Sequence, residues 1–176
     1  YPGKDRVPVQ SFLPLLRDLV MKGTYDLDPS RNNFLTTLHD PCNYVRQMGI
    51  VKPQRDILNA VMPKGNFHEM EPHGVNNYCC GGGSGFAIMN SMNFSYFRNN
   101  VSARKKLSQI LNAFGEASAD PSVIKYITAP CSNCKGTMRD LLEAWHMADY
   151  NFYYGGLVEL VVNAMTKFDE PFLEFL

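Results

Sequence analysis

The segment Val123–Cys134, which reads VIKYITAPCSNC, decides the expected fold. Its first half, Val123–Thr128, is rich in β-branched residues and is flanked by a proline on each side, a pattern typical of a buried strand. Cys131 and Cys134 follow at once as a Cys-x-x-Cys pair, and apolar residues at helical spacing continue from Cys134 onward. The segment therefore predicts a strand whose carboxyl end delivers two thiols to the start of a helix.

Similar strand-like and helical patterns alternate along the rest of the chain. Further strands are expected at Phe34–Leu38, Asn66–Met70 and Asn151–Tyr154. Apolar residues at helical spacing predict helices over 11–20, 53–61, 94–114, 134–145 and 157–168. Strands that alternate with helices indicate an α/β fold, with Rossmann-like β-α units around a mostly parallel sheet.

The chain length sets the expected domain organisation. A chain of 176 residues suits one compact domain with a sizeable core. We expect residues 1–32 to form an N-terminal helix and linker from a missing upstream region, and residues 33–176 to form the cysteine-containing domain. The sequence begins with Tyr1 and not with Met, which favours a fragment or a processed piece.

Composition excludes several classes of partner. Seventeen basic and seventeen acidic residues cancel, so no nucleic acid partner is expected. The longest apolar candidate, Leu157–Met165, is far shorter than the roughly 20 residues that cross a bilayer, so no direct membrane span is expected. No signal peptide is visible at the N-terminus, which favours a reducing, cytoplasmic compartment. There, clustered cysteines bind metal or carry redox chemistry more often than they form disulfides.

The five cysteines fall into three groups that follow three different predicted strands. Cys42 follows the first strand, Cys79 and Cys80 follow the loop after the second, and Cys131 with Cys134 follows the third. Ligands of open α/β sheets bind outside the carboxyl ends of the strands. We therefore expect the three groups to converge on one site at that edge of the sheet.

The adjacent pair Cys79-Cys80 favours an iron–sulfur cluster over the other possible roles of the cysteines. Cys131 and Cys134 alone fit a zinc half-site, a redox dithiol or iron–sulfur ligands. Neighbouring cysteines rarely bond to each other and do not easily face one tetrahedral zinc, whereas a multi-iron cluster offers several metal atoms. The glycines that follow the pair are Gly81, Gly82, Gly83 and Gly85. They let the backbone approach a bulky cluster and aim N–H groups at its sulfides.

These motifs together resemble a known family. His39-Asp40-Pro41-Cys42 with the run on to Arg46, then Cys79–Gly83, then Ala129–Lys135, is similar to the cysteine-rich CCG domain of the heterodisulfide reductase family. Within that family the motifs look closest to the DsrK subunits of the DsrMKJOP membrane complex in dissimilatory sulfur metabolism. The resemblance extends from about Leu38 to the C-terminus.

The resemblance implies a cofactor, an activity and partners. The five cysteines would be both the metal ligands and the catalytic residues of a non-cubane [4Fe–4S] cluster. The cluster would reduce, or form, a disulfide or trisulfide in one-electron steps. The substrate would be a small sulfur-carrier protein, DsrC-like, with C-terminal cysteines. Electrons would pass to or from membrane quinone-linked subunits of the same complex, which would hold the chain at the inner face of the membrane.

Two departures from the family pattern keep alternatives open. Family members carry ferredoxin-type motifs and another CCG-like half upstream, and neither is present in this sequence. The gap from Cys80 to Cys131 also exceeds the common family spacing, which we attribute to an inserted helix at Phe94–Phe114. One alternative uses the cluster only as an electron relay. Another is a structural zinc module that uses Cys42, one of the adjacent pair, and Cys131 with Cys134.

Three neighbours of the cysteines have two interpretations each. Arg46 either binds an anionic cluster or carboxylate, or is a surface arginine. His39 either donates a proton to a leaving thiolate or, as we prefer, hydrogen-bonds within its own turn. Lys135 either favours thiolates together with the helix dipole or is solvated. A basic run, expected to form a solvated helix face, comprises Arg98, Arg104, Lys105 and Lys106.

Overall fold

A parallel four-stranded sheet forms the centre of the computed structural model, which describes residues 9–83 and 95–173. The strands are β1 (Leu35–Leu38), β2 (Phe67–His68), β3 (Lys125–Thr128) and β4 (Phe152–Gly155). Their order across the sheet is β2-β1-β3-β4, and each of the pairings is parallel. The predicted α/β fold around a mostly parallel sheet is confirmed.

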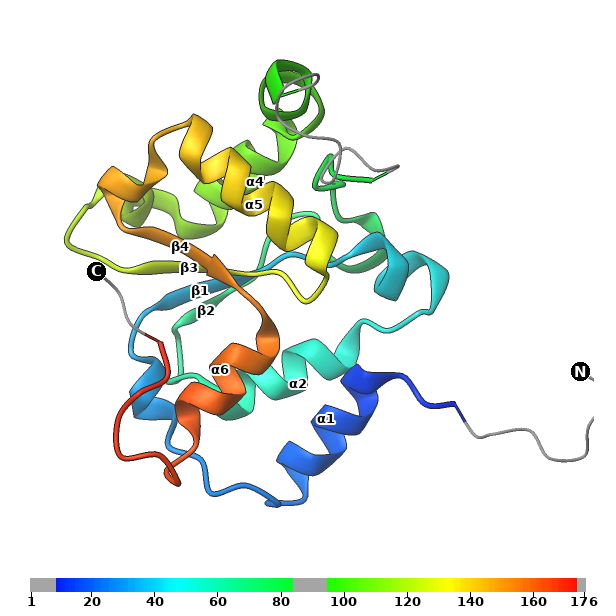
Figure 1. The fold of residues 1–176 in the computed structure, drawn as a ribbon, viewed down its shortest axis with the longest axis vertical. Coiled ribbons are helices and arrows are strands. Elements are labelled where there is room, and N and C mark those ends of the chain that lie inside the picture. Colours follow the sequence, from blue (N-terminus) through cyan, green and yellow to red (C-terminus); the bar gives the residue numbers. More distant parts are fainter. Residues whose placement is uncertain (1–8, 84–94, 174–176) are drawn as a thin grey trace, which may run out of the picture.

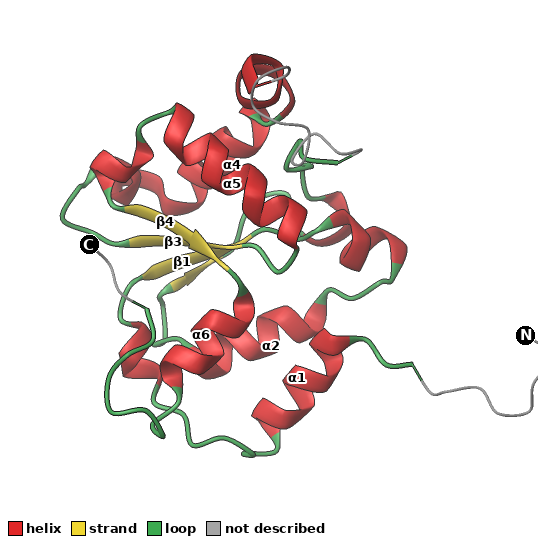
Figure 2. Ribbon diagram, viewed as in Figure 1, coloured by secondary structure: helices red, strands yellow, loops and turns green. Residues whose placement is uncertain are grey.

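Helices cover both faces of the sheet, as Figure 1 and Figure 2 show. One face carries α1 (Phe12–Met21), α2 (Lys52–Val61) and α6 (Leu157–Ala164). The other carries α4 (Arg104–Phe114) and α5 (Ser132–Ala144). Crossover helices between parallel strands place helices on both faces, which explains this three-layer arrangement.

The two faces bury separate sets of side chains, because successive strand residues point to opposite sides of a sheet. The apolar cluster, on the side of α1, α2 and α6, includes Leu13, Leu16, Leu38, Ile57, Leu58, Val61, Tyr126, Leu157, Leu160 and Val161. The cysteine-side cluster, on the side of α4 and α5, includes Met70, Cys80, Ala103, Leu107, Ile110, Ile127, Cys134, Met138, Leu141 and Phe152.

Two predicted elements are shorter than the sequence indicates. The strand expected at Asn66–Met70 is reduced to the two residues of β2, which pair with Thr36 and Thr37 of β1. The last helix was expected to continue to Phe168 but ends at Ala164, where Met165 instead forms an isolated antiparallel bridge with Leu27.

The helical face predicted between Phe94 and Phe114 is not continuous. Phe94 and Gly85 lie outside the described residues. A five-residue π-helical turn at Arg98–Ser102 precedes α4. A π turn contains more residues than an α turn and so rotates the preceding side chains relative to the helix that follows. Val101 lies within this turn and is 54% exposed, although the spacing placed it with the buried face.

The N-terminal helix belongs to the same packed unit as the sheet. Side chains of α1 lie in one apolar cluster with those of α2 and α6. Ser11 stands at the expected N-cap position, and its side chain makes no capping hydrogen bond. The domain boundary at residue 32 stays a prediction. Within the described residues, no helix combines the length and apolar character that a membrane crossing requires.

Candidate metal centre

The carboxyl ends of the strands bring the cysteines to one edge of the sheet. The pairing of β1 with β3 continues past the strands, because His39 N–H donates to the carbonyl of Thr128 at 2.9 Å. Cys42 therefore follows β1 beside the segment where Cys131 follows β3. Cys131 is the N-cap residue of α5, which places Cys134 in its first turn.

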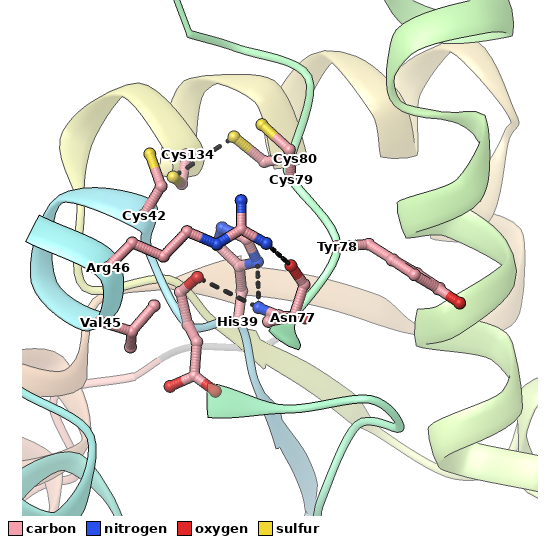
Figure 3. A pocket seen from close by; sticks show the side chains of 10 residues that line it. His39, Cys42, Val45, Arg46, Asn77, Tyr78, Cys79, Cys80 and Cys134 are labelled. Atoms are coloured by element: carbon pink, nitrogen blue, oxygen red, sulfur yellow. Dashed lines mark hydrogen bonds between the residues drawn. The ribbon is translucent and has the colours of Figure 1, made fainter. Parts of the chain in front are cut away.

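The five thiols gather around one point. The Sγ atoms of Cys80 and Cys134 lie 3.3 Å apart, and Cys131 forms a hydrogen bond with Cys134. Cys42, Cys79, Cys80 and Cys134 line the same pocket, and Figure 3 shows their sulfur atoms on one side of it. The structure thus brings together all five predicted cysteines. Their role as metal ligands stays a prediction.

The glycines after the adjacent pair fix that pair in place. Gly81 N–H donates to Sγ of Cys79 at 3.3 Å, and Gly82 N–H donates to Sγ of Cys80 at 3.4 Å. Gly81 has φ of +82°, and a Cβ there would lie 2.8 Å from the backbone carbon of Ser102. Backbone conformation and close packing therefore both require glycine at this position.

The metal-free thiols hold their protons unequally. Hydrogen bonds from Cys134 and Cys79 hold the pKa of Cys80 below its usual range. A hydrogen bond from Cys134 likewise lowers the pKa of Cys131 to about 6. The pKa of Cys134 is raised by its hydrogen bonds to Cys131 and Cys80, and the pKa of Cys79 is raised by its hydrogen bond to Cys80. The site thus favours thiolates at Cys80 and Cys131, and metal binding would displace the remaining protons.

His39 adds a nitrogen atom to this edge of the sheet. Its side chain is buried, and one ring nitrogen lies within 4.8 Å of the sulfur atoms of Cys80 and Cys134. Nδ1 lies 3.3 Å from the amide nitrogen of Asn77, whereas Nε2 makes no regular hydrogen bond within the described residues, and the ring interacts with the thiol of Cys80. The preferred expectation of a bond within its own turn is wrong, because Asn77 belongs to another loop. Burial lowers the pKa of His39, which favours the neutral ring.

Arg46 lines the same pocket as Cys42, Cys79, Cys80 and Cys134, and Figure 3 shows its side chain among them. Nε donates to the carbonyl of Val75 at 2.9 Å, and Nη2 donates to the carbonyl of Asn77 at 2.6 Å. Across residues 9–83 and 95–173, no carboxylate lies at ion-pair distance from this guanidinium. The side chain is thus held in place by neutral carbonyls, and its charge is available to an anion at the pocket.

The contacts of Lys135 and Gly83 in the structure do not involve the thiols. The ammonium group of Lys135 forms an ion pair with Glu159 of α6, which also accepts a hydrogen bond from the Tyr126 hydroxyl at 2.8 Å. The lysine therefore ties α5 to α6. A Cβ at Gly83 would meet no atom within 4 Å. The predicted contribution of both residues to cofactor binding stays a prediction.

A buried ion pair anchors the segment that leads to Cys42. The carboxylate of Asp40 accepts hydrogen bonds from both Nη atoms of Arg55, at 3.0 and 2.7 Å. It also accepts one from the backbone N–H of Gly74 at 2.6 Å. Arg55 donates further to Glu69. These contacts fasten the start of the site to the loop that carries the adjacent cysteines.

Two contributors to the site were missed in the sequence, and one of them left a signal. Asn77 stands in an irregular loop where no pattern marks it. We expected Lys106 and Arg98 to lie on a solvated helix face, but Lys106 is 0% exposed and Arg98 is 2% exposed. The expectation is therefore wrong for these two residues. Lys106 stands three residues after Ala103 and four before Ile110, so the helical spacing of the buried face includes it.

Comparison with known proteins assigns the fold and the cysteine pattern to a family. A model of the cysteine-rich domain named CCG matches residues 36–139, which include all five cysteines. The chain belongs to the CCG cysteine-rich domain family. The expected family resemblance is confirmed at this level.

Two curated archaeal proteins are similar to this CCG chain. The Hdr-like menaquinol oxidoreductase iron-sulfur subunit 2 of Archaeoglobus fulgidus is 31% identical over 149 residues, which are 82% of this chain and 24% of that protein. The Hdr-like menaquinol oxidoreductase iron-sulfur subunit of Archaeoglobus profundus is 29% identical over 163 residues, 90% of this chain and 27% of that protein. The chain spans about a quarter of the length of these relatives. No solved structure matches it.

The residues at the site fit a thiolate-bound metal group. Five cysteine sulfurs are the donors that iron–sulfur clusters use. The backbone N–H groups of Gly81 and Gly82 already donate to sulfur, and such hydrogen bonds tune cluster potentials. Nε2 of His39 is a buried polar atom that makes no regular hydrogen bond within the described residues, and a sulfur atom of a bound group would satisfy it.

Proposed function

We propose that this chain is the catalytic CCG module of an Hdr-like iron–sulfur oxidoreductase. Cys42, Cys79, Cys80, Cys131 and Cys134 hold a non-cubane [4Fe–4S] cluster, and the reaction reduces or forms a disulfide or trisulfide on a small sulfur-carrier protein. Quinone-linked membrane subunits exchange electrons with the module, which lies at the cytoplasmic face of the membrane. The relatives named as menaquinol oxidoreductase subunits support such an assembly.

The observation that carries the proposal is the number of thiols at one point. A structural zinc site uses four ligands, and this edge of the sheet collects five cysteines. The vicinal pair is held by two separate N–H···S contacts, one to each sulfur. Five thiolates with two of them adjacent suit a group that has several metal atoms.

The chain contributes substrate binding and charge at this site. When bound, the cluster supplies single electrons and iron atoms to which the sulfur atoms of the substrate can bind. The guanidinium of Arg46, held by the carbonyls of Val75 and Asn77, binds a carboxylate of the approaching carrier segment. An arginine held in place by backbone carbonyls loses little side-chain entropy when it binds an anion.

Anaerobic reconstitution with iron and sulfide tests the proposal. We expect stoichiometric iron and sulfide with visible absorption, and an EPR spectrum that changes when a thiol or a short disulfide peptide with a free C-terminal carboxylate is added. Arg46→Met should weaken the peptide response, while Lys22→Met, a distant exposed control, should not. A cluster whose spectrum ignores every thiol would instead identify an electron relay, and a colourless protein with five free thiols would reject the cluster.

A structural zinc site is the second candidate function, and one observation favours it. A ring nitrogen of His39 and the sulfur atoms of Cys80 and Cys134 all lie within 4.8 Å of one another, which supplies three of the four ligands of a tetrahedral zinc. Two thiolates on one tetrahedral zinc lie about 3.8 Å apart, given zinc–sulfur bonds of about 2.3 Å. The 3.3 Å between Cys80 and Cys134 is close to that separation. Elemental analysis that finds one zinc and no sulfide would establish this rival.

A further inference from the structure

Lys106 is a cation enclosed within the protein beside the cysteine site. Its side chain is 0% exposed. Nζ donates to Oδ1 of Asn77 at 2.7 Å, to the side-chain oxygen of Gln109, and to Sδ of Met70 at 3.6 Å. All three partners are neutral. In the described part of the chain, no carboxylate lies at ion-pair distance from this ammonium group.

A buried cation without an anionic partner is costly, so its surroundings must supply negative charge. Burial lowers the pKa of Lys106 to about 7, and the groups that oppose this are Cys80, Asp40, Cys134 and Cys79. Asp40 is already bound by Arg55 and by the backbone N–H of Gly74. The thiols of the cysteine site are therefore the remaining source of negative charge.

A chain of hydrogen bonds connects Lys106 to that site. An ammonium group only donates, so it fixes the carbonyl oxygen of Asn77 toward itself. The amide nitrogen of Asn77 then faces Nδ1 of His39 at 3.3 Å and the carbonyl of Asp40 at 3.1 Å. Nδ1 of the neutral ring must accept, so the ring proton sits on Nε2. Nε2 makes no regular hydrogen bond within the described residues, and the ring interacts with the thiol of Cys80.

We propose that Lys106, acting through Asn77 and His39, is the residue that sets the reduction potential of the cluster at this site. The inference rests on the proposed function and adds to it a positioning residue outside the thiol set. The negative charge of the thiolates favours the ammonium form of Lys106, and this positive charge stabilises the extra negative charge that the cluster gains with one electron. Through Asn77 it also presents the Nε2 proton of His39 as a donor to sulfur. Net charge and hydrogen bonds to sulfur both tune such potentials.

A redox titration of the reconstituted protein, followed by EPR and visible absorption, tests the inference. Lys106→Met should lower the equilibrium constant for one-electron reduction at least tenfold, a downward shift of about 59 mV or more. Arg104→Met is the matched control, because Arg104 carries the same charge on the exposed side of α4. Solvent and salt screen that charge, so its removal should leave the potential close to that of the wild type.

A second variant keeps the lysine and cancels its charge. Gln109→Glu places a carboxylate where Gln109 now accepts from the ammonium group, so it should lower the potential in the same direction. This covers the case in which Lys106→Met does not fold. If both variants give the potential of Arg104→Met, the inference is overturned while the proposed function stands. A wild type that holds no iron and sulfide overturns both.

Discussion

The two faces of the sheet differ in what they bury. The apolar cluster beneath α1, α2 and α6 consists of aliphatic and aromatic side chains, and its buried Asn32 amide is satisfied by the carbonyls of Val61 and Leu160. The cysteine-side cluster beneath α4 and α5 contains the thiols of Cys80 and Cys134, with the cation of Lys106 buried nearby.

Because of this difference, the apolar face mainly stabilises the fold, whereas the other face holds the thiols and the buried cation. Hydrophobic burial on the apolar side stabilises the fold whether or not a cofactor is present. Thiols and a lone cation on the other side stabilise it less, because each loses hydration when it is buried. Under the proposed function, the thiols gain their full partners when a metal group binds. Substitutions on the two faces should therefore change different measured quantities.

The largest effect is expected from Cys80→Ala, and from Cys79→Ala. Each should abolish normal cluster assembly, seen as loss of iron and sulfide after reconstitution, because under the proposed function the adjacent pair supplies two of the five ligands. The free energy of unfolding of the metal-free protein, measured in urea, should change by only about 1 kcal/mol, since one sulfur atom is removed. Iron content that stays unchanged in both variants would show that the pair is not part of the metal centre.

Leu58→Ala should produce the converse result. Leu58 is 0% exposed within the apolar cluster, so the truncation should lower the free energy of unfolding by about 2–5 kcal/mol. Iron bound per folded molecule should stay at the wild-type value. Val158→Ala, at a residue 41% exposed on α6, is the control and should change stability by less than about 0.5 kcal/mol. If Leu58→Ala loses bound iron per folded molecule as well as unfolding free energy, the two faces do not contribute separately to metal binding and to stability.

Gly81→Ala and Gly83→Ala compare two glycines of the same run. Gly81→Ala should cost about 1–3 kcal/mol in unfolding free energy and reduce iron binding, because its φ of +82° is strained for alanine and its Cβ would meet Ser102. Gly83→Ala should do neither, since nothing lies within 4 Å of its added Cβ. If the two variants bind iron equally, the cysteine loop does not depend on the close approach at Gly81.

Tyr126→Phe should give the smallest effect, about 1 kcal/mol at pH 8, from the lost hydrogen bond to Glu159. Burial beside Glu159 raises the pKa of Tyr126, so the folded protein keeps the phenol proton above about pH 10, where the unfolded chain releases it. The stability that Tyr126 adds is therefore complete below pH 10 and falls as the pH rises further. Urea unfolding at pH 8 and pH 11 should show the gap between wild type and variant closing. A gap that widens would contradict the sign.

Local patterns in the sequence predicted the architecture well, and the reason is physical. β-branched runs and helical spacing report burial within a few neighbouring residues, which is why β1, β3 and β4 and the helices α1, α2 and α5 lie close to their expected places. The failures also have local causes. The π turn at Arg98–Ser102 interrupts the helical spacing ahead of α4, so Val101 is exposed, whereas Leu107, Ile110 and Phe114 of α4 are buried as the spacing indicates.

The sequence by itself determined the parallel α/β fold and the three groups of cysteines that follow its strands. It also determined the glycines after the adjacent pair, because strand, turn and ligand chemistry are set by residue type and short spacing. Only the tertiary structure decided which groups the charged side chains contact. It placed Lys106 on Asn77, Arg46 on two backbone carbonyls, and Lys135 on Glu159. These partners are 24 to 31 residues apart in the chain, so packing, and not local pattern, selects them.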